Sequence, residues 1–250
     1  ATGTASTAMG QNTTASGTAS TAMGQNTTAS GPYSTALGKS NTASAYASVA
    51  MGEQNTASGT RAFAMGYYNN IASGENSVAI GYQTTASGSS SVAMGSTTTA
   101  SANYSTAIGY KTTASGKNSF AIGEETTASD FGSLTIGSYN LVNSTVATGH
   151  NANNYDTDNA AFVIGNGYED YSDWMNPITV NSDAFVVYFN GNATLSGDLT
   201  INSDERLKDN IQPLGSTLNK LHQIEGKTYS LKKDEEHTPK IGVLAQEVQA

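Results

Sequence analysis

A glycine returns at a nearly constant interval through the first half of this 250-residue chain, and this interval limits the fold more than any other feature. It closes a short motif, most often Ala-Met-Gly or Ala-Ile-Gly, and successive copies lie 14 residues apart, with one step of 15. The motif glycines are Gly10, Gly24, Gly38, Gly52, Gly66, Gly81, Gly95, Gly109, Gly123 and Gly137. Self-similarity at a fixed period is the signature of a solenoid, in which each repeat forms one coil.

A second half-repeat, Thr-Ala-Ser-Gly, lies between most of these motifs, for example at 28–31 and 85–88. A coil of this length is too short to contain a helix, but it fits two strands of about five residues joined by two tight turns. Glycine at the turns allows positive φ and a close approach of neighbouring backbones. Residues 3–17 and 17–31 are identical, which indicates growth by duplication. We therefore predict a mainly β fold of stacked parallel coils.

Because side chains alternate between the two faces of a strand, each coil has only a few apolar side chains with which to form a core. In the copy at 77–81, Val78 and Ile80 point to one face of the strand, whereas Ser77 and Ala79 point to the other. One or two medium-sized apolar side chains backed by alanine make a thin core, which cannot stabilise a coil on its own. We expect several chains to associate and to bury the apolar stripe between them.

The segments SVAIGYQTTASG (77–88) and STAIGYKTTASG (105–116) resemble the head repeats of trimeric autotransporter adhesins. The resemblance covers residues 1–150, because both half-repeats recur in register along this stretch. It implies a left-handed parallel β-roll solenoid that is built by a homotrimer.

Composition excludes several function classes. The chain carries a net charge of −9 and no basic patch, so we expect no binding to nucleic acid. It has no apolar run of the roughly 18 residues that a membrane span needs, so we expect no membrane insertion. The absence of cysteine excludes disulfides, and no pattern in the chain points to a cofactor.

Threonine pairs recur in the second half-repeat, as at Thr84-Thr85 and Thr112-Thr113. Stacked from coil to coil they form a ladder, for which two interpretations are open. One is a face that binds ice or glycans. The other, which the physics of sheets favours, is that β-branched residues suit a strand and that their hydroxyls bond along the ladder.

Tyrosines recur directly after the motif glycine, at Tyr67, Tyr82 and Tyr110. Such side chains on a rigid frame can stack on sugars or contact a protein, and they can equally cover the corner of the coil. The repeat with the extra residue is the best local candidate, because irregular loops on rigid frames tend to carry binding. The receptor-binding candidates are Tyr67, Tyr68, Asn69 and Asn70.

Residues 151–183 depart from the repeat and are acidic and aromatic, as in YEDYSDW (168–174). Asp156, Asp158 and Asn159 hint at a site for a hard cation, but the glycine and the distal glutamate of a calcium loop are missing. We therefore expect solvated loops without a metal, and we interpret this segment as a small junction module.

Residues 184–202 alternate with the period of a strand around Asn-Gly and Ser-Gly turns. This pattern predicts a β-rich stalk. The chain thus divides into β-roll repeats, a junction module, the stalk and a last segment of different composition. The predicted boundaries are 1–150, 151–183, 184–202 and 203–250.

The last segment begins with the charged stretch SDERLKDNIQPL. With LNKLHQIEGKTYSLK and IGVLAQEVQ, it resembles the start of the endosialidase-type intramolecular chaperone, a self-cleaving family at the C-terminus of phage tail spikes and fibres. The resemblance covers 203–250 and implies an element that aids trimerisation and is then released. Apolar residues at helical spacing over 214–224 predict a helix, KTYSLK predicts a strand, and KIGVLAQEVQA predicts a strand that enters a second helix. Together they indicate a small α+β piece. The match stops inside this motif, so we expect the rest of the chaperone to be absent from the chain.

The same resemblance implies cleavage of the Asn202–Ser203 bond, with Ser203 as the nucleophile and Lys208 as its base. A serine hydroxyl needs a neighbouring base, and Ser-Lys is a known variant of that arrangement. Lys208 must be neutral to act, which requires burial or a nearby positive charge. Arg206 can supply that charge, and Asp204 belongs to the same motif.

Spacing constrains this chemistry. If 203–208 formed one regular helix, Ser203 and Lys208 would lie about 140° apart around its axis and would not meet. Two arrangements therefore stay open: Ser203 precedes the helix in an extended segment, or the base comes from another chain of the trimer. A third interpretation needs no chemistry, because Ser203 also suits a helix cap, with Asp204 and Glu205 favourable at the helix start.

We interpret the chain as the homotrimeric tail fibre of a phage or virus, which attaches to a glycan or protein receptor on the host surface. The main alternative is a bacterial trimeric surface adhesin. The second is a tail spike that degrades host glycans, although the repeats offer scattered carboxylates rather than a facing pair. We expect no enzyme that acts on an external substrate, and the one reaction implied is a single-turnover cleavage by a serine autoprotease.

Overall fold

The structure is a computed structural model, and it describes residues 1–141, 151–172, 175–197, 225–229 and 239–242. The chain divides into two compact units, residues 1–199 and 200–250, which are described separately. All regular elements within the described residues are β-strands.

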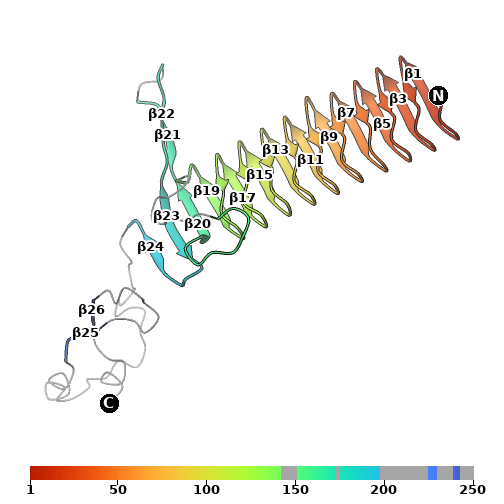
Figure 1. Cartoon of the computed structure of the whole chain (residues 1–250). Helices are drawn as coiled ribbons and strands as arrows, with labels where there is room; N and C mark the ends of the chain where they lie inside the picture. Colours follow the sequence, from red (N-terminus) through yellow and green to blue (C-terminus); the bar gives the residue numbers. More distant parts are fainter. Residues whose placement is uncertain (142–150, 173–174, 198–224, 230–238, 243–250) are drawn as a thin grey trace, which may run out of the picture. The chain divides into compact units, whose positions relative to one another are not determined.

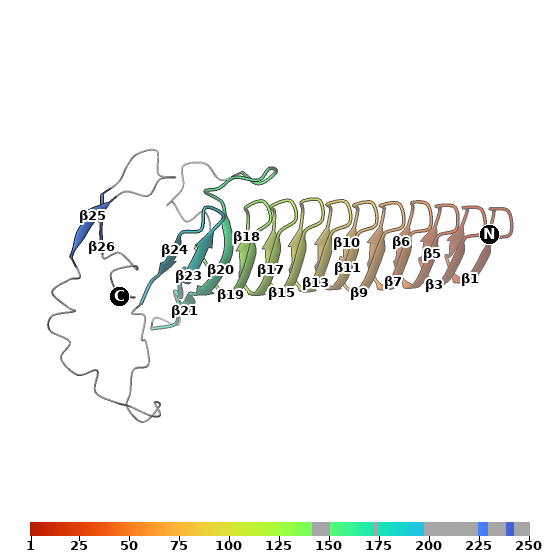
Figure 2. The ribbon, with the colours of Figure 1, turned by 90° about the horizontal axis from the view of Figure 1, so that it is seen from below.

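Each coil of the first unit contributes one strand of five residues to a parallel sheet. These long strands are β1 (Thr7–Gln11), β3 (Thr21–Gln25), β5 (Thr35–Lys39), β7 (Val49–Glu53), β9 (Phe63–Tyr67), β11 (Val78–Tyr82), β13 (Val92–Ser96), β15 (Thr106–Tyr110), β17 (Phe120–Glu124) and β19 (Leu134–Ser138). They pair in register, so that Gly81 lies between Gly66 and Gly95. Figures 1 and 2 show the coils stacked in one row. The predicted parallel β-solenoid is confirmed.

The second strand of each coil has only two residues. These short strands, which form a second parallel sheet, are β2 (Thr14–Ala15), β4 (Thr28–Ala29), β6 (Thr42–Ala43), β8 (Thr56–Ala57), β10 (Ile71–Ala72), β12 (Thr85–Ala86), β14 (Thr99–Ala100), β16 (Thr113–Ala114) and β18 (Thr127–Ala128). The prediction of two strands of equal length was wrong, because a turn occupies most of this half-repeat. In one such turn, Ser77 donates from its backbone N and its Oγ to the carbonyl oxygen of Gly74 (3.2 and 2.7 Å).

Small side chains fill the interior of the coils. The hydrophobic cluster inside them consists of alanines, among them Ala79 and Ala86, which are fully buried. Ser77 also points inward, whereas Val78 and Ile80 lie on the outside and are only partly buried. The predicted alternation of this strand is confirmed.

A column of buried asparagines runs through the corner that follows the long strand. The Asn55 amide donates to the carbonyl oxygens of Met51 (2.7 Å) and Gly66 (2.8 Å). The Asn70 amide donates to Oδ1 of Asn55 and to the carbonyl oxygen of Gly81, both at 2.7 Å. Each buried amide therefore satisfies backbone groups of its own coil and of the next, which ties neighbouring coils together at this corner.

The long-strand sheet continues past the repeats. β20 (Ala160–Asn166) adds in parallel to β19, and the buried Asp130 fixes its start by accepting a hydrogen bond from the backbone N of Ala160 (2.8 Å). β23 (Asp183–Tyr188) then pairs antiparallel with β20, and β24 (Ala193–Leu195) pairs with β23. The strand pattern predicted around an Asn-Gly turn is confirmed for this last hairpin.

A separate hairpin leaves the sheet between β20 and β23. It consists of β21 (Tyr168–Asp170) and β22 (Ile178–Val180), which pair antiparallel. Figure 1 shows this hairpin projecting from the end of the row of coils. Its first strand begins right after Gly167, whose carbonyl oxygen accepts a hydrogen bond from Ser138 Oγ (2.8 Å) at the end of β19. The hairpin is thus tied to the last coil at its base.

In the second unit, β25 (Lys227–Tyr229) pairs antiparallel with β26 (Lys240–Gly242). Both strands were predicted from the sequence and are confirmed. The helix predicted over 214–224 and the second helix, predicted to follow KIGV, lie outside the described residues. Where the structure describes the chain, it contains no helix that is long and apolar enough to cross a membrane.

Candidate functional site

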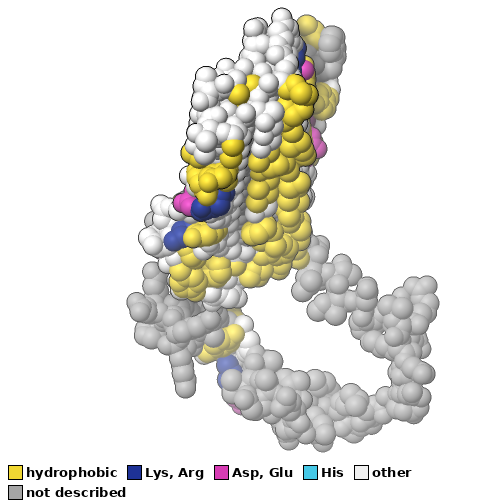
Figure 3. All heavy atoms as spheres, turned by 90° about the vertical axis from the view of Figure 1, so that its right-hand side faces the viewer, with side chains coloured by type: hydrophobic (Ala, Val, Ile, Leu, Met, Phe, Trp, Pro, Cys, Tyr) yellow, Lys and Arg dark blue, Asp and Glu magenta, His cyan; other side chains and the backbone are white. Residues whose placement is uncertain are grey.

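The outer face of the long-strand sheet carries the largest apolar side chains of the solenoid. We call the Met, Leu, Ile, Val and Phe side chains at the first and third positions of these strands the apolar band. Met94, Ile108, Phe120 and Ile122 belong to it, and each is at least 36% exposed. Figure 3 shows hydrophobic side chains gathered along the coils. Because soluble single chains rarely expose a long apolar strip, this face suits association with further chains.

Three tyrosines form a cluster at the corner that follows the long strand. The ring of Tyr82 lies 6.1 Å from that of Tyr67 and 5.8 Å from that of Tyr68, measured between ring centres. Tyr67 and Tyr82 are neighbours in the sheet register, and the three side chains are 59%, 40% and 41% exposed for Tyr67, Tyr82 and Tyr68. This tyrosine cluster therefore presents aromatic surface to solvent.

The two asparagines of the same repeat differ in position. Asn69 is exposed in the turn, with a φ of 59°. Asn70 is fully buried in the interior column and has no surface to offer to a receptor, so we remove it from the binding candidates. Alignment of its repeat with those of Asn41 and Asn55, which occupy the same interior position, was the signal that could have placed it inside.

The threonine pairs are split between the inside and the outside of the coil. Thr84 and Thr112 are fully buried, whereas Thr85 and Thr113 lie on the outer face and are half-buried. In these coils the outer face thus presents one threonine rather than a pair, and in β10 the same position holds Ile71. This arrangement favours the structural interpretation of the ladder.

The acidic loop before β20 uses its polar groups in local hydrogen bonds. Asp156 Oδ1 accepts from the backbone N of Asp158 (3.0 Å), and the buried Asn159 donates to the carbonyl oxygen of Asn151 (2.9 Å). Among the residues that the structure describes, there is no group of three or more His, Cys, Asp or Glu that could hold a metal ion.

The residues predicted for self-cleavage lie outside the described residues. They are Asn202, Ser203, Asp204, Arg206 and Lys208.

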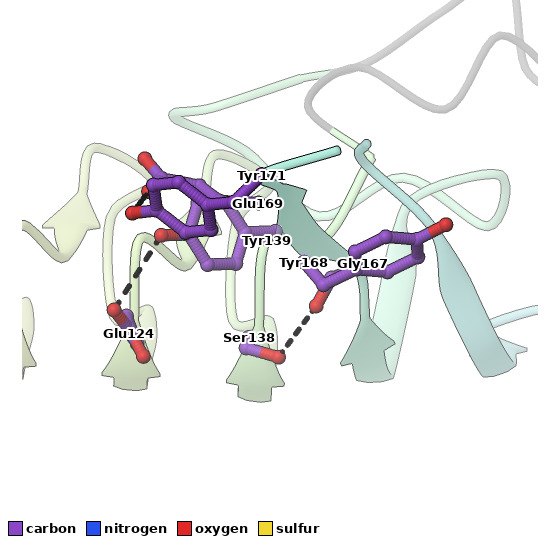
Figure 4. A pocket seen from close by; sticks show the side chains of 7 residues that line it. All are labelled: Glu124, Ser138, Tyr139, Gly167, Tyr168, Glu169 and Tyr171. Carbon is purple, nitrogen blue, oxygen red and sulfur yellow. Dashed lines mark hydrogen bonds between the residues drawn. The ribbon is translucent and has the colours of Figure 1, made fainter. Parts of the chain in front are cut away.

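A hollow of about 260 Å³ lies where the hairpin meets the last coils, and sequence reasoning missed it. We call it the tyrosine–glutamate hollow; it is lined by Glu124, Ser138, Tyr139, Gly167, Tyr168, Glu169 and Tyr171 (Figure 4). Burial raises the pKa of the Tyr139 phenol to about 12, and the carboxylates of Glu125 and Glu124 add to this shift. The only signal in the sequence was the acidic and aromatic stretch that begins at Tyr168.

Comparison with known families finds matches in two segments of the chain. Segments 1–27, 15–41, 43–69, 72–98, 86–112, 100–126 and 114–139 match the family described as YadA head domain repeat. Residues 203–250 match the family described as chaperone of endosialidase. No curated protein matches the chain. The two resemblances seen in the sequence are thereby confirmed, and together they indicate an adhesin-like or tail-fibre protein. Because the head-repeat matches cover more than half of the residues, this chain belongs to the family of proteins that carry the YadA head domain repeat.

Proposed function

We propose that the chain is a homotrimeric fibre that attaches a phage or virus particle to its host. The observation that carries this proposal is the inverted distribution of apolar side chains in the solenoid. Alanines such as Ala79 fill the interior, whereas Ile108, Phe120 and Ile122 remain exposed in the apolar band. Fully burying an exposed side chain of this size contributes about 1.5–3 kcal/mol. These side chains are already more than half buried, so a trimer that covers the band gains a fraction of that amount at each coil.

The chaperone segment supports a fibre of a virus particle rather than an adhesin of a bacterial surface. Residues 203–250 match a chaperone family whose resemblance to this segment points to phage tail spikes and fibres, and such an assembly helper serves a chain whose thin interior depends on association. The head repeats alone suit either protein, so the bacterial adhesin remains the second candidate. In that case we expect a membrane anchor at the C-terminus of the complete protein in place of a self-cleaving chaperone.

We further propose that the chaperone segment is released by cleavage of the Asn202–Ser203 bond. In this step, Ser203 Oγ attacks the carbonyl carbon of Asn202 while Lys208, which must be neutral to act, takes the hydroxyl proton. The Asn202–Ser203 peptide bond breaks, and water then hydrolyses the resulting ester. Arg206 is the nearby basic residue of the motif that can favour the neutral form of Lys208. We expect the full-length protein to yield a fragment whose N-terminus is Ser203, and Ser203→Ala to abolish this fragment. Mass spectrometry of the purified products measures both.

Ser216→Ala is the matched control, because it removes another serine hydroxyl of the same segment outside the motif. It should leave cleavage unchanged. A Ser203→Ala variant that is still cut at the same bond would contradict the proposal. Mixed trimers of Ser203→Ala and Lys208→Ala chains decide where the base comes from: recovered cleavage assigns it to a neighbouring chain, and complete inactivity assigns it to the same chain.

For attachment, we propose that the tyrosine cluster contacts a glycan or protein of the host surface. Its rings are exposed, fixed by their mutual packing, and held on a rigid sheet, which limits the entropy lost on binding. We expect the double variant Tyr67→Ser/Tyr82→Ser to lose about tenfold or more in affinity for host cells, as is typical of an aromatic anchor. Binding of the labelled protein to a panel of bacterial strains measures this.

Tyr33 and Tyr46 provide the control for this experiment. Their rings pack edge to face with centres 5.4 Å apart, and they are 57% and 50% exposed at the opposite corner of the coil. The variant Tyr33→Ser/Tyr46→Ser removes the same number of exposed rings and should bind host cells normally. Equal binding by both double variants would argue against the tyrosine cluster as the contact site.

A further inference from the structure

The tyrosine–glutamate hollow combines residues from three separate parts of the first unit. Glu124 ends β17, Tyr139 follows β19, and Glu169 and Tyr171 come from β21 and the residue after it. Figure 4 shows the side chains of Tyr139, Glu169 and Tyr171 gathered on one side of β21, while Tyr168 points away from them. The hollow is open to solvent, and a small polar group can enter it.

Tyrosine hydroxyls hold both carboxylates of the hollow. The Tyr139 hydroxyl donates to Glu124 Oε1 (3.4 Å), and the Tyr171 hydroxyl donates to Glu169 Oε2. Each carboxylate keeps further lone pairs for a ligand, because an ionised carboxylate accepts about four hydrogen bonds. The hollow therefore offers negative charge and aromatic rings, which suit a positively charged ammonium group. A primary ammonium group can also donate hydrogen bonds to the carboxylates.

The charged side chains around the hollow also favour a positively charged ligand. Within the described residues, neither Glu124 nor Glu169 pairs with a basic side chain. Glu125 lies next to the hollow and pairs with Lys111, whose positive charge also acts on Glu169. Around the hollow, the three carboxylates of Glu124, Glu125 and Glu169 therefore outnumber this one ammonium group. Tyr139 is only 6% exposed, so its ring is held in place beside them.

The surface next to the hollow already binds one ammonium group of the protein itself, that of Lys111. The Lys111 ammonium pairs with the carboxylate of Glu125 and lies 5.1 Å from the centre of the Tyr110 ring. Tyr110 is the neighbour of Glu124 in the sheet register. An ammonium group held by a carboxylate and a tyrosine ring is therefore an arrangement that this corner of the coil supports, and ring faces attract such cations.

We propose that the tyrosine–glutamate hollow is a binding site for an ammonium group, with Glu124 and Glu169 as its charge partners and Tyr139 and Tyr171 as its rings. The group is a primary or quaternary ammonium, such as a lysine side chain, an amino sugar or a choline headgroup carries. The site does not depend on the tyrosine cluster or on the fibre interpretation.

Titration calorimetry or ligand-observed NMR on the whole chain tests this proposal with butylamine, glucosamine and choline as probes. Butanol, N-acetylglucosamine and 3,3-dimethylbutanol are their neutral counterparts. We expect at least one ammonium probe to bind with a Kd of about 1 mM and its neutral counterpart to bind at least tenfold more weakly. The probe that binds most tightly identifies the source of the amine.

Glu169→Gln and Glu124→Gln keep the shape of each side chain and remove its charge, so each should weaken binding about tenfold or more. Tyr171→Leu should also weaken it by removing a ring. Glu53→Gln is the control, because Glu53 lies outside the hollow and pairs with Lys39. Equal binding of charged and neutral probes, no binding of any ammonium probe at ten times the expected Kd, or glutamine variants that bind like the unaltered protein would overturn the proposal.

Discussion

Gly81→Ala is expected to lower the free energy of unfolding by at least about 4 kcal/mol, a loss well above that of an ordinary substitution. Gly81 has a φ of +136°, which side-chain-bearing residues rarely adopt, and a Cβ placed on it would lie 1.9 Å from the carbonyl oxygen of Gly95. That oxygen belongs to the backbone of the next coil, so the coils must separate to accommodate the methyl group. Thermal and denaturant unfolding at a fixed protein concentration measures the loss.

Substitutions at two other glycines serve as controls that distinguish the steric clash at Gly81 from the cost of its positive φ. Gly132 also has a positive φ, of +69°, but its Cβ would meet only the edge of the Phe189 ring at 3.4 Å, so Gly132→Ala should cost only about 1–2 kcal/mol. Gly197 has nothing within 4 Å of its Cβ position, so Gly197→Ala should be close to neutral. If Gly81→Ala proved no worse than Gly132→Ala, the close stacking of the coils would be contradicted.

The double variant Ile108→Asp/Ile122→Asp is expected to break the assembly. The two side chains are neighbours in the sheet register, and both belong to the apolar band. In a trimer that buries this band, every chain would bring two unpaired carboxylates into an apolar contact, where removing an ion from water costs several kcal/mol. We expect the trimer to be lost in light scattering, and the separated chains to lose their β structure in circular dichroism.

Asn118→Asp serves as the control, because it adds a negative charge at an exposed turn residue. Its φ of 61° suits aspartate as well as asparagine, so neither the fold nor the assembly should change. An Ile108→Asp/Ile122→Asp variant that remained as large and as stable as the unaltered protein would show that the apolar band faces solvent and not another chain.

The coil could be predicted from the sequence because its constraints are local and repeated. The alternation at Val78, Ala79 and Ile80 assigns each side chain to the inside or the outside, and the recurring glycine fixes the corner and the register. The length of the second strand escaped prediction, because the turn closed by Ser77 consumes residues that have strand propensity. Propensity alone does not reveal where such a turn begins.

Features that depend on distant segments were out of reach. Asn70 was misplaced for a different reason: the extra residue beside it shifts its repeat by one position, and aligning this repeat with those of Asn41 and Asn55 would have placed it in the interior column. Glu124 and Glu169 line the same hollow only because β20 pairs with β19 after the chain has left the coils. No local sequence pattern predicts this pairing. The acidic and aromatic stretch at Tyr168 indicated an unusual surface, but it did not predict which residues of the last coils lie beside it.

Light scattering of the unaltered protein tests the central claim most directly. A solenoid with an interior of alanine and an apolar exterior should be folded only as an assembly, so we predict a single species of three times the 25.7 kDa chain mass. Its circular dichroism should show β structure that is lost on dilution below the dissociation constant. A stable, fully folded particle with the mass of one chain would contradict the claim that association supplies the stability which the thin interior lacks.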